Sequence, residues 1–177
     1  MSSKSVRFIA ILFTALLAAG AARAEEASKP NPLDTVPDKM PFDIPYGEPI
    51  SLERAQGVIA AASAEARKHD WKMNISVVDS GGNLVAFQRM DGAQLASIQI
   101  SQHKARAAAT YRRETKVFEN AIQLNNMNYV ATLDGVIASR GGIPLVESGK
   151  LIGAIGCSGG TGSQDEASCK AGAATLK

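Results

Sequence analysis

The sequence predicts an α+β domain in which helices cover the faces of an antiparallel sheet. Two pairs of apolar segments are each joined by a short turn containing glycine, which is typical of β-hairpins. Helical repeats precede, separate and follow the two pairs. The expected order is therefore helix, hairpin, two helices, hairpin, helix.

The first helix is expected over residues 52–69, where apolar residues recur at helical spacing. Ser51 is a suitable N-cap, and Glu53 lies in the first turn, where the helix dipole favours an acid. Two further helices are expected over residues 94–113 and 116–124. A last helix is expected to begin at Ser163, because residues 163–166 fit the capping box S-x-x-E.

Alternating apolar and polar residues predict the first strand over residues 71–77. A turn at residues 80–83 leads into a second strand over residues 84–90. The second hairpin is expected from residues 143–146 and 151–156, which are again separated by a glycine-containing turn.

The N-terminus resembles a secretory signal peptide, predicted over residues 1–24. Lys4 and Arg7 provide a positive start, an apolar run of twelve residues follows at positions 8–19, and Ala22-Arg23-Ala24 fits an A-x-A cleavage site. The run is shorter than the roughly 20 residues that a membrane span needs. We therefore expect a periplasmic or secreted protein with no membrane span after cleavage.

Cleavage after residue 24 would remove three basic residues and no acidic one, so the formal charge falls from +2 to −1. A near-neutral domain argues against nucleic acid as a partner. Six of the seven prolines lie between Pro30 and Pro49, which predicts an extended arm over residues 25–49 before a domain at 50–177. The arm is either a plain linker or a segment lying on a neighbouring subunit, and the alternating Phe42, Ile44 and Tyr46 could pack.

The glycines around residues 156–160 fit two functional interpretations and one structural one. Residues 156–160 fit G-x-S-x-G, but both histidines, His69 and His103, precede the serine, which argues against a serine hydrolase. The glycines could also cradle a phosphate at a helix N-terminus. Asp165 and Glu166 would repel an anion there, so close packing of strand against helix is the expected role.

His103 is the main candidate ligand residue, since histidine binds haem iron and neighbouring cations pair with the propionates. Its alternative role is that of a residue on a solvated basic helix face. The candidate cofactor-binding residues are His103, Lys104, Tyr111, Arg112, Arg113 and Thr115.

Cys157 and Cys169 are the only cysteines, so a structural zinc site is not expected. An oxidising compartment would permit a disulfide between them, if the strand returning into the last helix brings their Cα atoms within about 4.4–6.8 Å. The pairing is a hypothesis at this point.

Several motifs together resemble the GlcG/HbpS-like family of haem-binding proteins, which is related to the C-terminal domain of PduO-type proteins. They cover nearly all of the chain after Tyr46, in order. The matching pieces lie at residues 76–85, 89–92, 104–105, 111–118, 141–144, 153–160, 164–165 and 170–172.

The resemblance implies a profilin-like fold with a five-stranded antiparallel sheet, whose fifth strand would come from residues 130–138. It also implies a homo-oligomer, often an octamer, with haem near subunit contacts. Ala107 stands where family members often have threonine, so the iron ligand would be His103 or Thr115. Cys157 and Cys169 stand where small apolar residues are expected.

The leading hypothesis is a periplasmic, homo-oligomeric protein that binds haem or a related tetrapyrrole. The first alternative is an enzyme that acts on a small organic acid, or degrades haem, without another cofactor. No carboxylate pair stands out as an acid/base couple, which weighs against an enzyme. The second alternative is an extracytoplasmic partner of a membrane sensor.

Overall fold

The computed structural model describes residue 31, residues 34–40 and residues 42–176. The predicted signal peptide lies outside these residues. The chain divides into two units, Met1–Met40 and Pro41–Lys177. The described residues of the first unit are all exposed, and everything below concerns the second. Among the described residues, no helix has the length and apolar character needed to cross a membrane.

The second unit is built on one antiparallel sheet of four strands in the order β2-β1-β4-β3. Both predicted hairpins are present, with β1 paired to β2 and β3 paired to β4. The central pair, β1 and β4, joins the two hairpins. The strands are β1 (Asn74–Asp79), β2 (Leu84–Arg89), β3 (Gly142–Glu147) and β4 (Lys150–Ser158).

The expected fifth strand over residues 130–138 is wrong. Asn128–Thr132 form a 3-10 helix, η2, and Asp134-Gly135 form a turn in which Gly135 has φ +70°. A left-handed glycine reverses the chain within the span that a strand would need. Outside the four strands, the only pairing in the described part of the chain is an isolated parallel bridge between Tyr46 and Leu151.

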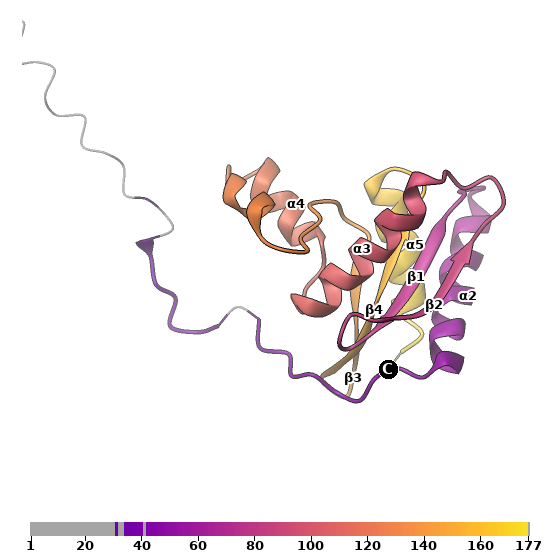
Figure 1. Ribbon diagram of the computed structural model, residues 1–177, viewed down its shortest axis with the longest axis horizontal. Helices are drawn as coiled ribbons and strands as arrows, with labels where there is room; N and C mark the ends of the chain where they lie inside the picture. The colour runs from indigo at the N-terminus through magenta and orange to yellow at the C-terminus, as the bar shows by residue number, and fades with distance from the viewer. Residues whose placement is uncertain (1–30, 32–33, 41, 177) are drawn as a thin grey trace, which may run out of the picture. The chain divides into compact units, whose positions relative to one another are not determined.

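Three α-helices cover the sheet, with α3 on one face and α2 and α5 on the other (Figure 1). The α-helices in the described part of the chain are α2 (Leu52–Lys68), α3 (Ala96–Thr110), α4 (Lys116–Gln123) and α5 (Gly162–Ala173). Helix α5 begins earlier than expected. Its N-cap is Thr161, and the capping box pairs Thr161 with Gln164, whereas Ser163 already lies inside the helix.

The two faces of the sheet are packed differently. The α2 and α5 face holds the larger core, including Met73, Ile75 and Leu145. The α3 face is made of small residues, so the helix backbone approaches the strand closely. A Cβ added at Gly156 of β4 would collide with the backbone of Ser101 and Ala105. The glycine is thus required by close packing, as the sequence predicts.

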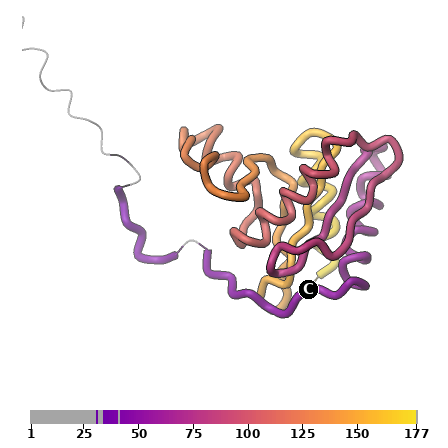
Figure 2. Tube along the Cα trace, viewed as in Figure 1, coloured from indigo at the N-terminus to yellow at the C-terminus, as the bar shows by residue number. Residues whose placement is uncertain are grey.

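Helix α4 and η2 pack against each other as a lobe beside the sheet (Figure 2). Phe118 of α4 is buried, but several large apolar side chains of this lobe are exposed. They are Val117, Leu124, Tyr129 and Leu133. We call this set the α4–η2 patch.

Candidate functional site

His103 lies on the exposed face of α3, in line with Gln99, Arg106 and Thr110 at helical spacing. Its imidazole has no hydrogen-bond or ion-pair partner among the described residues. The side chain is therefore open to an external ligand, while the face itself has the character of a solvated polar helix surface.

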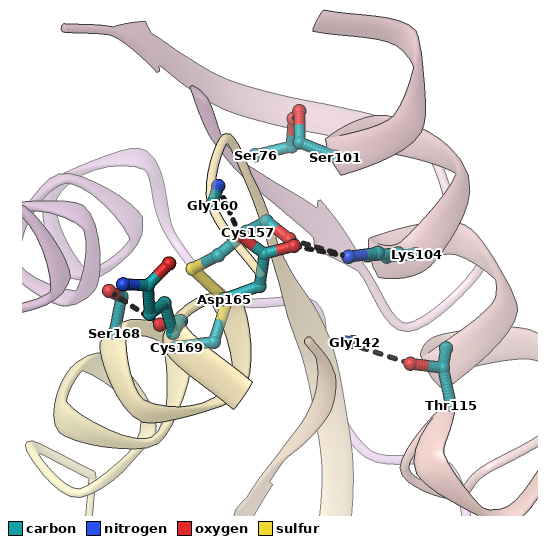
Figure 3. The surroundings of a disulfide bond; sticks show 11 residues. Ser76, Ser101, Lys104, Thr115, Gly142, Cys157, Gly160, Asp165, Ser168 and Cys169 are labelled. Atoms are coloured by element: carbon teal, nitrogen blue, oxygen red, sulfur yellow. Dashed lines mark hydrogen bonds and ion pairs between the residues drawn. A yellow bond between two sulfur atoms is a disulfide. The ribbon is translucent and has the colours of Figure 1, made fainter. Parts of the chain in front are cut away.

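Lys104, the next residue, points the opposite way. Its side chain is 1% exposed, and its Nζ donates to Asp165 Oδ2 at 2.7 Å and to the carbonyl oxygen of Cys157 at 3.2 Å (Figure 3). The ammonium is thus sequestered, and the expectation that Lys104 contacts a ligand is not supported by its position. Sequence reasoning treated Asp165 only as part of the expected capping box and as a charge that would repel an anion, and it missed this pair.

Asp165 lies at the start of α5, and its carboxylate has a second partner besides Lys104. Its Oδ1 accepts from the backbone N–H of Gly160 at 3.0 Å. Burial raises the pKa of the Asp165 carboxyl, and the neighbouring Lys104 ammonium acts in the opposite direction.

A disulfide joins Cys157 of β4 to Cys169 of α5, with Cα atoms 5.6 Å apart and both residues fully buried. Cys157 supplies a carbonyl to Lys104, and Cys169 follows Asp165 by one helical turn (Figure 3). The disulfide therefore joins α5 to β4 covalently, and the ion pair joins the same helix to α3 by charge.

The Thr115 side chain also has its hydrogen-bond partners inside the protein. It is fully buried, its Oγ1 donates to the carbonyl of Ser139 at 2.7 Å, and it accepts from the N–H of Gly142 at 2.9 Å. This leaves it badly placed for iron. Tyr111 is half-buried, and its hydroxyl donates to the carbonyl of Asp134 at 2.6 Å, which ties the end of α3 to the α4–η2 lobe.

Arg112 and Arg113 follow the end of α3, and Arg112 takes a left-handed conformation with φ 54°. Both guanidinium groups face the segment before α2. Arg112 donates to the carbonyls of Phe42 and Ile44, at 3.1 and 2.9 Å, and Arg113 lies over the ring of Phe42. Burial lowers the pKa of Arg113. The two arginines that the sequence suggests for the haem propionates thus already have partners within the chain.

A second charged cluster joins α4 to α5 and was not predicted. Arg140 pairs with Glu119 at 2.6 Å and with Glu166 at 3.5 Å, and Glu166 also pairs with Lys116 and Lys170. The cluster borders an open cavity of about 370 Å³. The described residues include no group of three or more histidine, cysteine, aspartate or glutamate side chains placed to hold a metal ion.

Comparison with known proteins gives consistent results. The family model "Haem degrading protein HbpS-like" matches residues 50–174. Protein GlcG of Escherichia coli strain K12 is 43% identical over 109 residues, which cover 62% of this chain and 81% of GlcG.

Solved structures share the fold. A double mutant of Streptomyces reticuli HbpS superposes with a TM-score of 0.68 and 27% identity, over 81% of this chain and 98% of that chain. A complex of PduOC with haem has a TM-score of 0.66 and 25% identity, over 73% of this chain and 96% of that chain. The chain belongs to the HbpS-like family.

Proposed function

We propose that this protein binds haem or a related tetrapyrrole, and that it does so outside the cytoplasm as a homo-oligomer. The observation that carries the proposal is the similarity to PduOC, a protein crystallised with haem, together with membership of a family described by its relation to haem. An octamer is the assembly that the family resemblance implies.

The contacts of the candidate residues support His103 as the one that would hold the iron. Its imidazole is exposed and has no partner among the described residues, so it fits an axial ligand, whereas the side chains of Thr115 and Lys104 are hydrogen-bonded inside the fold. Arg112 and Arg113 are half-buried cations at the end of the same helix and fit the propionates. Haem would supply the ligand-binding and redox chemistry of its iron.

Two further features support the proposal. The α4–η2 patch contains four exposed large apolar side chains, with Leu124 at 72%, and such a surface is available for contacts between subunits. Export rests on the signal-peptide pattern of residues 1–24, and a buried disulfide agrees with an oxidising compartment.

The test is a hemin titration of the exported protein, followed by its Soret band, for wild type, His103→Ala and Gln99→Ala. Gln99 is one turn before His103 on the same exposed face and serves as the control. A saturable, shifted band that only His103→Ala loses would support haem binding through this imidazole. A band retained by all three proteins would remove His103 as the ligand, and absence of saturable binding in wild type would reject the haem proposal.

Haem degradation is a second candidate function, favoured by the description of the family. It is distinguished by incubating the hemin complex with a reductant and oxygen and separating the pigments by chromatography. Recovery of intact haem would favour a binding protein, and enzyme-dependent conversion to open-chain products would favour degradation.

A further inference from the structure

Residues 42–47 form a strap that lies across the end of α3 and the start of β4. Its backbone is fixed to β4 by two hydrogen bonds. The N–H of Leu151 donates to the carbonyl of Pro45 at 2.8 Å, and the N–H of Gly47 donates to the carbonyl of Leu151 at 2.7 Å. These bonds produce the isolated bridge at Tyr46.

The other side of the strap is held by the end of α3. The hydroxyl of Tyr46 donates to the carbonyl of Thr110 at 3.0 Å. Arg112 uses Nη1 for Ile44 and Nη2 for Phe42. Its guanidinium also lies 5.4 Å from the centre of the Tyr46 ring.

The strap contacts the guanidinium groups of Arg112 and Arg113, which a ligand carboxylate would also contact. The two terminal nitrogens of Arg112 are the pair that forms an end-on bidentate contact with a carboxylate, and both donate to strap carbonyls. The ring of Phe42 covers the face of Arg113. A ligand carboxylate bound end-on at Arg112 therefore competes with the strap carbonyls for these two nitrogens.

The strap is nevertheless held by contacts that can be exchanged. Tyr46 is exposed, and Phe42 and Ile44 are only partly buried. Pro45 within it and Pro49 beyond it restrict the backbone to extended conformations, which reduces the entropy lost on docking. Contacts of this type are individually weak.

We propose that the strap is an intramolecular competitor for the arginine end of the ligand site, displaced when a dicarboxylate ligand such as a tetrapyrrole binds. The inference rests on the proposed function and adds a regulatory step to it. A closed strap reduces the apparent affinity by the fraction of molecules in which the arginines are free. Ligand binding must in turn release the strap.

Amide hydrogen exchange of the full exported chain tests this directly. Hemin should speed exchange at Gly47 and Leu151, whose N–H groups are held by the strap bridge, while Ile155 in the middle of β4 stays protected. In Phe42→Ala, exchange at the two strap amides should rise without ligand. Hemin affinity should rise about fivefold, the value of one exposed cation–π contact. Met40→Ala, which changes an exposed residue outside the strap, should match wild type.

The outcomes separate the two proposals. Saturable hemin binding with unchanged amide exchange at Gly47 and Leu151 would overturn the proposal that the strap is displaced, and would leave the haem-binding proposal intact. Unchanged hemin affinity and unchanged amide exchange in Phe42→Ala would also overturn the strap proposal. Failure of wild type to bind hemin would reject the proposed function, and the strap as a competitor for that ligand with it.

Discussion

Lys104 and Asp165 form an ion pair across the end of the sheet, with Nζ 2.7 Å from Oδ2 and side chains 1% and 4% exposed. Lys104 comes from the helix on one face and Asp165 from a helix on the other. Because the charges are removed from water, each depends on the other for compensation. The pair thus connects the two helical layers at the point where Gly141 and Gly142 leave no room for larger side chains.

Asp165→Asn should lower the free energy of unfolding by about 3–5 kcal/mol, because it leaves the Lys104 ammonium buried without a counter-charge. Lys104→Met should lower the free energy of unfolding by a similar amount, because it leaves the Asp165 carboxylate buried without a counter-charge. The measurement is urea unfolding followed by circular dichroism. The double variant should be more stable than the sum of the two losses implies, and simple additivity would show that the two groups act independently.

Gly156 and Gly57 offer opposite outcomes for the same substitution. Gly156→Ala should lose several kcal/mol, because its Cβ would collide with the backbone of α3 at Ser101 and Ala105. Gly57→Ala should gain about 0.5–1 kcal/mol, because it lies within α2 and a Cβ there meets nothing within 4 Å. Thermal unfolding of both variants measures this, and a stable Gly156→Ala protein would contradict the close approach of α3 to β4.

The hairpins and helices could be predicted from the sequence because their signals are local. Alternation at residues 71–77 and helical spacing at residues 52–69 each depend on neighbours along the chain. The fifth strand was expected only from the family resemblance, and the turn at Asp134-Gly135 opposed it. The predicted start of α5 lies later than the observed one, because Thr161 and Ser163 are both residue types that suit an N-cap.

The candidate site was harder to predict because it depends on which face of α3 is buried. Lys104 was grouped with His103 by sequence proximity, although adjacent residues on a helix point in different directions. A signal was present: Ser97, Ser101, Ala105 and Ala108 form a stripe of small residues, and Lys104 lies on its edge. Alternation at Phe42, Ile44 and Tyr46 indicated that the strap could pack, but its partner could not be predicted, since the contacts with Arg112 join positions about 70 residues apart.

The disulfide between Cys157 and Cys169 should contribute about 3 kcal/mol to stability, the expected value for closing a loop of this length in the unfolded chain. Cys157→Ala/Cys169→Ala should unfold at lower urea concentration than oxidised wild type and should be unaffected by a dithiol reductant. Reduced wild type should approach the double variant. Two free thiols in the exported protein, measured by mass spectrometry after alkylation, would contradict the disulfide in the native state.

Glu119 should make stability depend on pH in the acid range. The hydrogen bond from Arg140 is the largest effect on this carboxyl and holds its pKa below the ordinary value. A depressed pKa in the folded state means that the contribution is complete above the unfolded pKa, about 4.3, and is lost as pH falls through the lower folded value. Glu119→Gln should therefore be about 1.5–3 kcal/mol less stable than wild type at pH 7, a typical value for a hydrogen bond to a charged group. The difference should shrink below about pH 4.

Urea unfolding between pH 7 and pH 3 measures the stability of wild type and of Glu119→Gln as a function of pH. The control is Glu48→Gln, which changes an exposed carboxyl outside the cluster. Parallel curves for wild type and Glu119→Gln would show that the ion pair with Arg140 does not form in solution.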